Sequence, residues 1–237
     1  MKTSTLTFKN ALISTASICV LLSQSAHAQS VGVFGLFESK KESVQRKSIE
    51  QLEIQATSMG CALRREGKIL ATQGDYDIPA VNGFFLLECE SSFLQKDRSQ
   101  AVIKKFKHST EYLALIEGPV NQFGSLGLAK SGSSNSYIFK LSEYNNITPK
   151  RRNTDLMKLD HLVKTRIDRY KAEAFVRVTD AFGMKRPDEV VVIYYDSAES
   201  GERFRGNDKN SDIMGLIGKF NKEHLTQASY LIAQSNR

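Results

Sequence analysis

The sequence predicts an α+β protein with a mainly antiparallel sheet and with helices on one face of that sheet. Helical periodicity alternates along the chain with short apolar runs, and turn-forming residues separate neighbouring runs as in β-hairpins. The order helix, strand, strand, helix, strand occurs twice, which indicates an internal duplication of an α-β-β-α-β unit. A chain of 237 residues suits one domain, or two small ones that share a core.

Residues 1–28 have the pattern of a secretory signal peptide. Two lysines give a positive start, residues 11–22 form an uncharged apolar run, and Ala26 and Ala28 precede a cleavage point before Gln29. The apolar run is too short to span a membrane as a helix. We therefore expect a periplasmic or secreted protein of bacterial type, with no transmembrane segment in the mature chain.

The first half is expected over residues 29–119. Its predicted elements are a helix over 43–59, strands over 61–70 and 81–89, a helix over 97–107 and a strand over 112–116. In the first helix, Ile49, Leu52 and Ala56 recur at helical spacing and mark the inward face. Residues 29–37 are apolar with two glycines, and the pattern leaves open an edge strand or a mobile arm.

Two cysteines remain after the predicted signal peptide, Cys61 and Cys89. An even pair in an oxidising compartment predicts a disulfide. A hairpin centred on Asp75 would place the two cysteines opposite each other, so the predicted hairpin and the predicted disulfide agree. The sequence lacks the paired ligand spacing of a metal site, and we expect no metal and no cofactor.

The second half is expected over residues 154–237, after a flexible connector over 120–153 that contains one short strand at 137–141. Its predicted elements are a helix over 156–170, strands over 174–179 and 189–195 around a turn at 183–188, a helix over 213–220 and a strand over 230–233. Short sequence similarities between the halves support the duplication, although any α+β chain offers such similarities by chance.

The long charged segment over 196–212 is the most distinctive predicted binding site. It follows a buried strand and enters a helix, where free backbone N–H groups favour an anion. A solvated loop without function is the alternative. The residues assigned to the site are Asp196, Arg203, Arg205, Asp208 and Asp212. Asp208, Asn210 and Asp212 have the alternating spacing of ligands in a calcium-binding loop. However, Ile213 and Lys219 stand at the positions where that loop needs Gly and Glu.

No familiar catalytic motif occurs in the sequence, and the mature chain has three histidines on separate elements, His108, His161 and His224. His161, beside the inward positions of its predicted helix, is the first suspect for catalysis. A lone histidine near a helix end is nonetheless more often structural.

The full chain has a formal net charge of +7. The basic clusters begin at Arg64, Lys104 and Lys150, and they lack the interleaved aromatic residues of single-strand binders. We therefore expect no nucleic acid, and a partner that is a protein or an anionic envelope component. These observations predict a non-catalytic binding or assembly protein of the bacterial envelope. The alternatives are a periplasmic hydrolase with dispersed catalytic residues and a binder of anionic envelope polymers, which would need the basic clusters on one face.

Overall fold

The computed structural model describes residues 30–120, 136–145, 149–165, 171–195, 197–206 and 211–236. The predicted signal peptide and much of the predicted connector lie outside this range. The first elements are β1 (Val31–Glu38), α1 (Glu42–Thr57), β2 (Cys61–Gly74), β3 (Gly83–Cys89), α2 (Asp97–His108) and β4 (Tyr112–Pro119). They are followed by β5 (Ser136–Tyr144), α3 (Pro149–Thr165), β6 (Lys171–Arg177), β7 (Asp180–Phe182), β8 (Glu189–Tyr195), α4 (Ala198–Gly206), α5 (Ser211–His224) and β9 (Leu225–Ser235).

The described strands form a single antiparallel sheet in the order β6-β8-β5-β9-β2-β3-β1-β4-β7. Within it, β2-β3-β1-β4 and β6-β8-β5-β9 have the same arrangement, that of a ferredoxin-like β-α-β-β-α-β unit. Strands β2 and β9 join the two units. The predicted α+β class is confirmed, and each unit contains one strand more than the sequence pattern indicated. A common origin of the two units stays a prediction.

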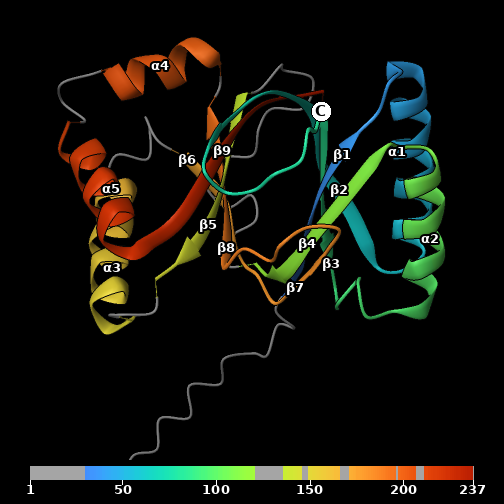
Figure 1. Ribbon diagram of the computed structural model, residues 1–237, viewed down its shortest axis with the longest axis horizontal. Helices are drawn as coiled ribbons and strands as arrows, with labels where there is room; N and C mark the ends of the chain where they lie inside the picture. Colours follow the sequence, from blue (N-terminus) through green and yellow to red (C-terminus); the bar gives the residue numbers. More distant parts are fainter. Residues whose placement is uncertain are drawn as a thin grey trace, which may run out of the picture.

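The sheet curls so that its two ends approach each other. Val120, just beyond β4, bridges to Val176 of β6, and the Thr179 backbone N–H donates to the Glu117 carbonyl oxygen at 2.9 Å. One core cluster fills the inside of the curl with side chains from both units, such as Phe34 and Phe84 of the first and Phe139 of the second. The helices cover the outside, with α1 and α2 at one end and α3, α4 and α5 at the other (Figure 1).

The outer layer of the first unit is closely packed. Ile49, Leu52 and Ala56 of α1, the predicted inward face, are all buried and contact α2 and the sheet. On the strand beneath them, a Cβ added to Gly35 would lie 2.1 Å from the ring of Phe85. Phe85 is itself held by an edge contact with Phe106, at 5.5 Å between ring centroids. The absence of a side chain at Gly35 therefore makes room for the Phe85 ring.

Gly35→Ala should lower the free energy of unfolding by about 1–3 kcal/mol, because the ring that it meets has no free space to move into. Urea unfolding followed by circular dichroism measures the change. Gly215→Ala is the matched control: Gly215 is at an exposed position of α5, and an added Cβ there meets nothing within 4 Å. That control should raise the free energy by about 0.5–1 kcal/mol. Equal effects of the two substitutions would contradict the packing argument.

The hairpin and disulfide predictions are confirmed. Cys61 pairs with Cys89 across β2 and β3, and the two sulfur atoms are bonded with a Cα–Cα separation of 4.0 Å. The register shifts by one residue at a bulge between Leu63 and Arg65, so the pairing expected for a hairpin centred on Asp75 holds only at the cysteine end of the hairpin.

Two predictions about irregular segments are wrong. Residues 31–38 form β1, which lies between β3 and β4 inside the sheet rather than at its edge or as an arm. Residues 198–206 form helix α4 within the segment predicted as a loop over 196–212. Both errors arise because a short segment obtains its structure from tertiary packing, which local periodicity does not record. The predicted helix over 156–170 begins earlier, at Pro149.

No described helix is long and apolar enough to cross a membrane.

Candidate functional site between the second-unit sheet and its helices

The outer side of the second-unit sheet carries both apolar and charged residues in neighbouring rows. The strand pairings place Ile193, Ile138 and Ile232 in one row across β8, β5 and β9. The next row on the same face holds Val191, Lys140 and Tyr230. A third row begins with Glu189 and Ser142. Because alternate residues of a strand share a face, these three rows form one continuous floor beneath α3 and α5.

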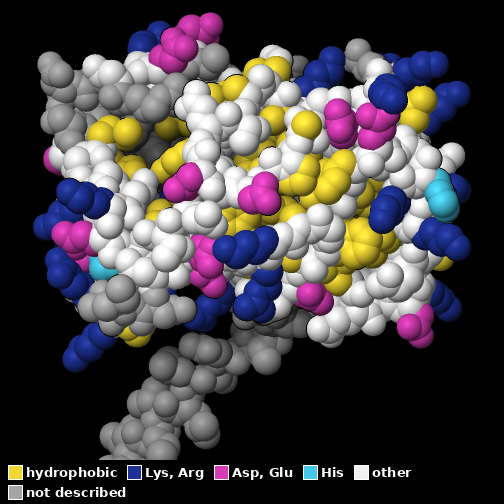
Figure 2. Space-filling model, viewed as in Figure 1, with side chains coloured by type: hydrophobic (Ala, Val, Ile, Leu, Met, Phe, Trp, Pro, Cys, Tyr) yellow, Lys and Arg dark blue, Asp and Glu magenta, His cyan; other side chains and the backbone are white. Residues whose placement is uncertain are grey.

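The apolar part of this floor is incompletely covered. Ile138, Val191 and Ile232 are only half-buried, in contrast to the closely packed outer face of the first unit. Figure 2 shows hydrophobic side chains in a hollow in the left part of the molecule, the part that holds α4 and α5 in Figure 1. From the helix side, Ile213 and Ile217 of α5 pack on this floor. An apolar surface left half-covered inside a fold is suited to a small ligand.

The polar part of the floor is a connected set of buried groups. Lys140, which is 9% exposed, donates from Nζ to Asn221 Oδ1 at 3.0 Å. Asn221 in turn donates from Nδ2 to the Tyr230 hydroxyl at 2.7 Å. Glu189, which is 2% exposed, accepts a hydrogen bond from the Tyr144 hydroxyl. An amine, a carboxyl and two phenols therefore lie on the same face as the half-covered apolar rows.

Burial changes the proton affinity of each of these groups. Desolvation lowers the pKa of Lys140, and the negative charge of Glu189 opposes part of that shift. Desolvation raises the pKa of Glu189, against the attraction of Lys140. The pKa values of Tyr144 and Tyr230 are raised, again mainly by burial. The neutral forms of the amine and the carboxyl are therefore closer in free energy to the charged forms than they are in water.

Aromatic and cationic neighbours hold this set in place. The Arg152 guanidinium of α3 lies over the Tyr144 ring, with its carbon 4.1 Å from the ring centroid. The Phe220 ring of α5 lies 5.6 Å from Lys140 Nζ and makes an edge contact with the Tyr144 ring. These contacts fix the side chains of the floor from the helix side.

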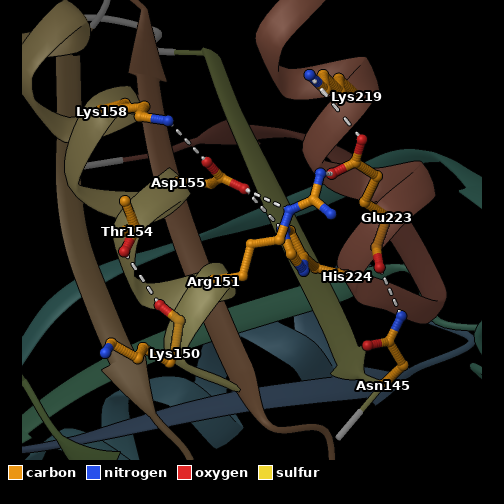
Figure 3. A network of polar contacts seen from close by, with 9 residues as sticks. All are labelled: Asn145, Lys150, Arg151, Thr154, Asp155, Lys158, Lys219, Glu223 and His224. Atoms are coloured by element: carbon orange, nitrogen blue, oxygen red, sulfur yellow. Dashed lines mark hydrogen bonds and ion pairs between the residues drawn. The ribbon is translucent and has the colours of Figure 1, made fainter. Parts of the chain in front are cut away.

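An ion-pair network next to this floor ties α3 to α5 (Figure 3). His224, which is 1% exposed, pairs through Nε2 with Asp155 Oδ2 at 3.0 Å. Arg151 donates to Glu223 at 2.7 Å, and Lys158 lies 3.2 Å from Asp155 Oδ1. The hydrogen bond with His224 is the largest cause of the lowered pKa of Asp155, and the bond with Lys158 is the next.

Asp155→Asn should lower the melting temperature at neutral pH, and this effect should shrink as the pH falls below 3.8. The folded pKa of Asp155 lies below its ordinary value of 3.8, so its contribution to stability is present above that value and is lost as the pH falls through the folded pKa. Melting curves from pH 2.5 to 7 measure the difference between variant and wild type. Asp77→Asn, at an exposed position between β2 and β3 and outside the network, is the control. A difference that stays constant down to pH 2.5 would contradict the assignment.

The same network contains a geometric cluster that resembles a metal site. One ligand atom each from Asp155, Glu223 and His224 lies within 4.8 Å of the others. However, Arg151 already lies between the two carboxylates, 2.7 Å from Glu223 and 3.9 Å from Asp155, and Lys219 lies 4.0 Å from Glu223. Positive side chains therefore take the place that a cation would occupy, and the cluster fits a helix-to-helix clamp.

The three described histidines differ in their surroundings. His224 pairs through Nε2 with Asp155, and its Nδ1 is buried with no hydrogen-bond partner. His108 and His161 are exposed on α2 and α3. His161 was the first candidate for catalysis because it lies beside the inward positions of its predicted helix, but its side chain is exposed.

Two of the five site residues predicted from the sequence, Arg203 and Asp212, are described with their side chains, and both are exposed rather than part of the buried floor. Arg203 is exposed on α4, and Asp212 is exposed in the first turn of α5, where its Oδ1 accepts the Ile213 backbone N–H at 2.9 Å. Asp196, Asp208 and the side chain of Arg205 lie outside the described residues. A binding role for these five residues stays a prediction. Sequence reasoning missed Lys140 and Glu189, although a charged residue inside each apolar strand run was the available signal.

The predicted basic clusters do not form one surface. Lys104 lies on α2 and Arg151 on α3, and these helices are at opposite ends of the molecule (Figure 1). Arg64 pairs with Glu88 across β2 and β3, and Arg65 donates to the Tyr137 hydroxyl in the interior. The clusters therefore do not provide the single positive face that an anionic polymer would need.

A second hollow, of about 230 Å³, lies between α1 and α2 in the first unit. Leu52, Val102 and Phe106 line it together with polar side chains such as Gln51 and Lys105. Its titratable residues, Lys105 and His108, are exposed. The second-unit floor, with its enclosed amine and carboxyl, is the stronger candidate for chemistry.

No protein-family model matches the sequence, and no curated protein matches it. Solved structures share the fold. An anthrone oxidase-like protein superposes with a TM-score of 0.58 at 12% identity, over 87% of this chain and 91% of that chain. A protein from Lactobacillus acidophilus, assigned provisionally as a monooxygenase, gives 0.53 at 8% identity over 88% and 95%. Chlorite dismutase from Candidatus Nitrospira defluvii, in complex with imidazole, gives 0.56 at 11% identity over 90% and 93%.

At sequence identities of 8–12%, the similarity to these structures shows a shared fold only. The names of the matching structures nevertheless overturn the functional prediction from the sequence, which was a non-catalytic envelope binding protein. They are oxidase-like, monooxygenase and dismutase proteins, not binding or assembly modules. The sequence prediction rested on the absence of a catalytic motif. That absence carries little weight, because buried charged residues on separate strands, such as Lys140 and Glu189, form no recognisable sequence motif.

Proposed function

We propose that this protein is an enzyme of the oxidase or monooxygenase type whose active site is the floor of the second-unit sheet. The observation that carries the proposal is the burial of Lys140 and Glu189 beside a half-covered apolar surface. A buried amine and a buried carboxyl are costly to the fold, and such pairs with shifted pKa values gather at functional sites. The names of the proteins that share the fold support the same class of reaction.

The proposed substrate is an apolar compound with an acidic hydroxyl or an enolisable ketone. Its apolar body would lie on the half-buried row of Ile138 and Ile232, and its polar end would reach Lys140. The lowered pKa of Lys140 favours the neutral amine, which can accept a proton from the substrate. The resulting anion is more electron-rich and more easily oxidised by dioxygen. Asn221 and Tyr230 would hold the amine and the developing oxyanion in position.

Dioxygen uptake tests this function. The mature protein is mixed with a panel of naphthols, hydroquinones and anthrone in an oxygen electrode, and products are identified by mass spectrometry. Lys140→Met should reduce the rate on an active compound by about 100-fold or more, as expected for loss of a general base. Lys104→Met, at an exposed position on α2, should have no effect. Absence of uptake with every compound, or a fully active and folded Lys140→Met variant, would refute the proposal.

We further propose that the signal peptide is cleaved before Gln29 and that the enzyme acts in the periplasm or outside the cell. The Cys61–Cys89 disulfide supports an oxidising compartment. The intact mass of the protein recovered from that compartment tests the cleavage point. A mass that still includes residues 1–28 would refute it.

A further inference from the structure

Lys140 is placed as a reactive amine rather than as a structural cation. It lies in the middle of β5, directly opposite Val191 on one side and Tyr230 on the other. Among the described residues, its Nζ donates one hydrogen bond, to the neutral amide of Asn221. The Phe220 ring closes another side at 5.6 Å. A structural lysine is usually exposed or paired directly with a carboxylate, whereas this amine faces an amide, a ring and an apolar surface.

Glu189 is placed to exchange protons beside this amine. It stands opposite Ser142, one row from Lys140 on the same face of the sheet. The Tyr144 hydroxyl fixes its carboxyl by a hydrogen bond. Burial favours the protonated carboxyl, so the site can offer a neutral nucleophile and a proton donor at the same pH. This combination is what condensation of an amine with a carbonyl group requires.

We propose that Lys140 forms an imine with the carbonyl carbon of an apolar aldehyde or ketone that binds on this floor. The nitrogen lone pair attacks the carbonyl carbon, a C–N bond forms, and Glu189 donates a proton to the carbonyl oxygen. The nitrogen then loses both of its protons: one returns to the Glu189 carboxylate, and the other reaches the hydroxyl oxygen, which leaves as water. The balance is one amine and one carbonyl compound giving one imine and one water, with no oxidant or reductant.

The proposal rests on the site of the proposed function, but Lys140 here acts as a nucleophile rather than as a general base, and only the carbonyl compounds among the proposed substrates can take part. An imine withdraws electrons from the neighbouring carbon, so a C–H bond there becomes more acidic. The half-buried isoleucine row selects an apolar body, and an aromatic aldehyde of one or two rings is the simplest probe of that selection.

Reductive trapping tests the imine. The mature, disulfide-intact protein is incubated at pH 7 with naphthaldehyde and sodium cyanoborohydride, which reduces an imine to a stable amine. Peptide mass mapping then gives the rate of labelling at each lysine. Lys140 should be labelled at least about tenfold faster than the exposed Lys104, because the apolar rows would hold the aldehyde beside Nζ and a lowered pKa raises the neutral fraction of the amine. Glyoxylate, a small charged aldehyde, should show no such preference for Lys140.

Two variants complete the test. Lys140→Arg should remove the fast-labelled peptide and leave the labelling of Lys104 unchanged. Asn221→Leu, which removes the hydrogen bond to Nζ, should change the rate at Lys140 alone. Equal rates at Lys140 and Lys104 in the wild type would overturn the proposal, whatever the variants do. Fast labelling without dioxygen uptake would support the imine and reject the oxidase function, whereas uptake without labelling would do the reverse.

Discussion

The double variant Lys140→Met/Glu189→Gln should be more stable than the wild type by about 1–4 kcal/mol while losing the proposed activity. Burial destabilises the charged form of each group by more than their mutual attraction stabilises it, because desolvation is the largest cause of both pKa shifts. Methionine fills the space of the lysine stem, and glutamine can still accept the hydrogen bond from Tyr144. Thermal and urea unfolding at pH 7 measure the gain.

The single variants should behave in the opposite way, because each leaves one buried charge without its partner. In Lys140→Met, the pKa of Glu189 remains above its ordinary value of 4.5 in the folded state. The stability of this variant should therefore be highest below that pH and should fall as the pH rises through the folded pKa. A double variant that is less stable than either single variant would show that the pair serves the fold rather than the chemistry.

Removal of the disulfide has the other large effect that we expect. Cys61→Ser/Cys89→Ser should lower the free energy of unfolding by about 3–4 kcal/mol, because the bond closes a loop with a sequence separation of 28. Both cysteines are buried at the end of the β2–β3 hairpin beneath α1, so the serine hydroxyls would also enter an apolar cluster.

Urea unfolding of the serine variant, the oxidised wild type and the reduced wild type separates the two contributions. The reduced wild type reports the loss of the cross-link without new hydroxyl groups, and it should account for most of the change. A reduced protein that is as stable as the oxidised one would contradict the chain-entropy argument.

Several parts of the fold were predictable because local and tertiary preferences agree there. The spacing of Ile49, Leu52 and Ala56 identified the buried face of α1, and the apolar run at residues 189–195 coincides with β8. The pairing of Cys61 with Cys89 followed from hairpin register and cysteine count together. Each of these signals is carried within a short segment or by two segments joined by one turn.

The candidate site could not be predicted in the same way. Lys140 and Glu189 lie on strands that pair only in the folded sheet, and Asn221 reaches them from a later helix. From the sequence alone, a lysine within an apolar strand predicts a solvent-facing residue on a sheet with one exposed face. Here the outward face is covered by α3 and α5, which turns the same alternation into a buried amine.

The position of β9 has a consequence for how the chain is made. Residues 225–235 are synthesised after every other strand of the sheet, yet they lie between β5 and β2 and join the two units. Until they emerge, the backbone groups of β2 and β5 that pair with β9 have no strand to bond, and such open strands invite pairing with other chains. The sheet therefore depends on β9 for its completion, so a chain that stops before residue 225 should aggregate rather than fold as a slightly shorter protein.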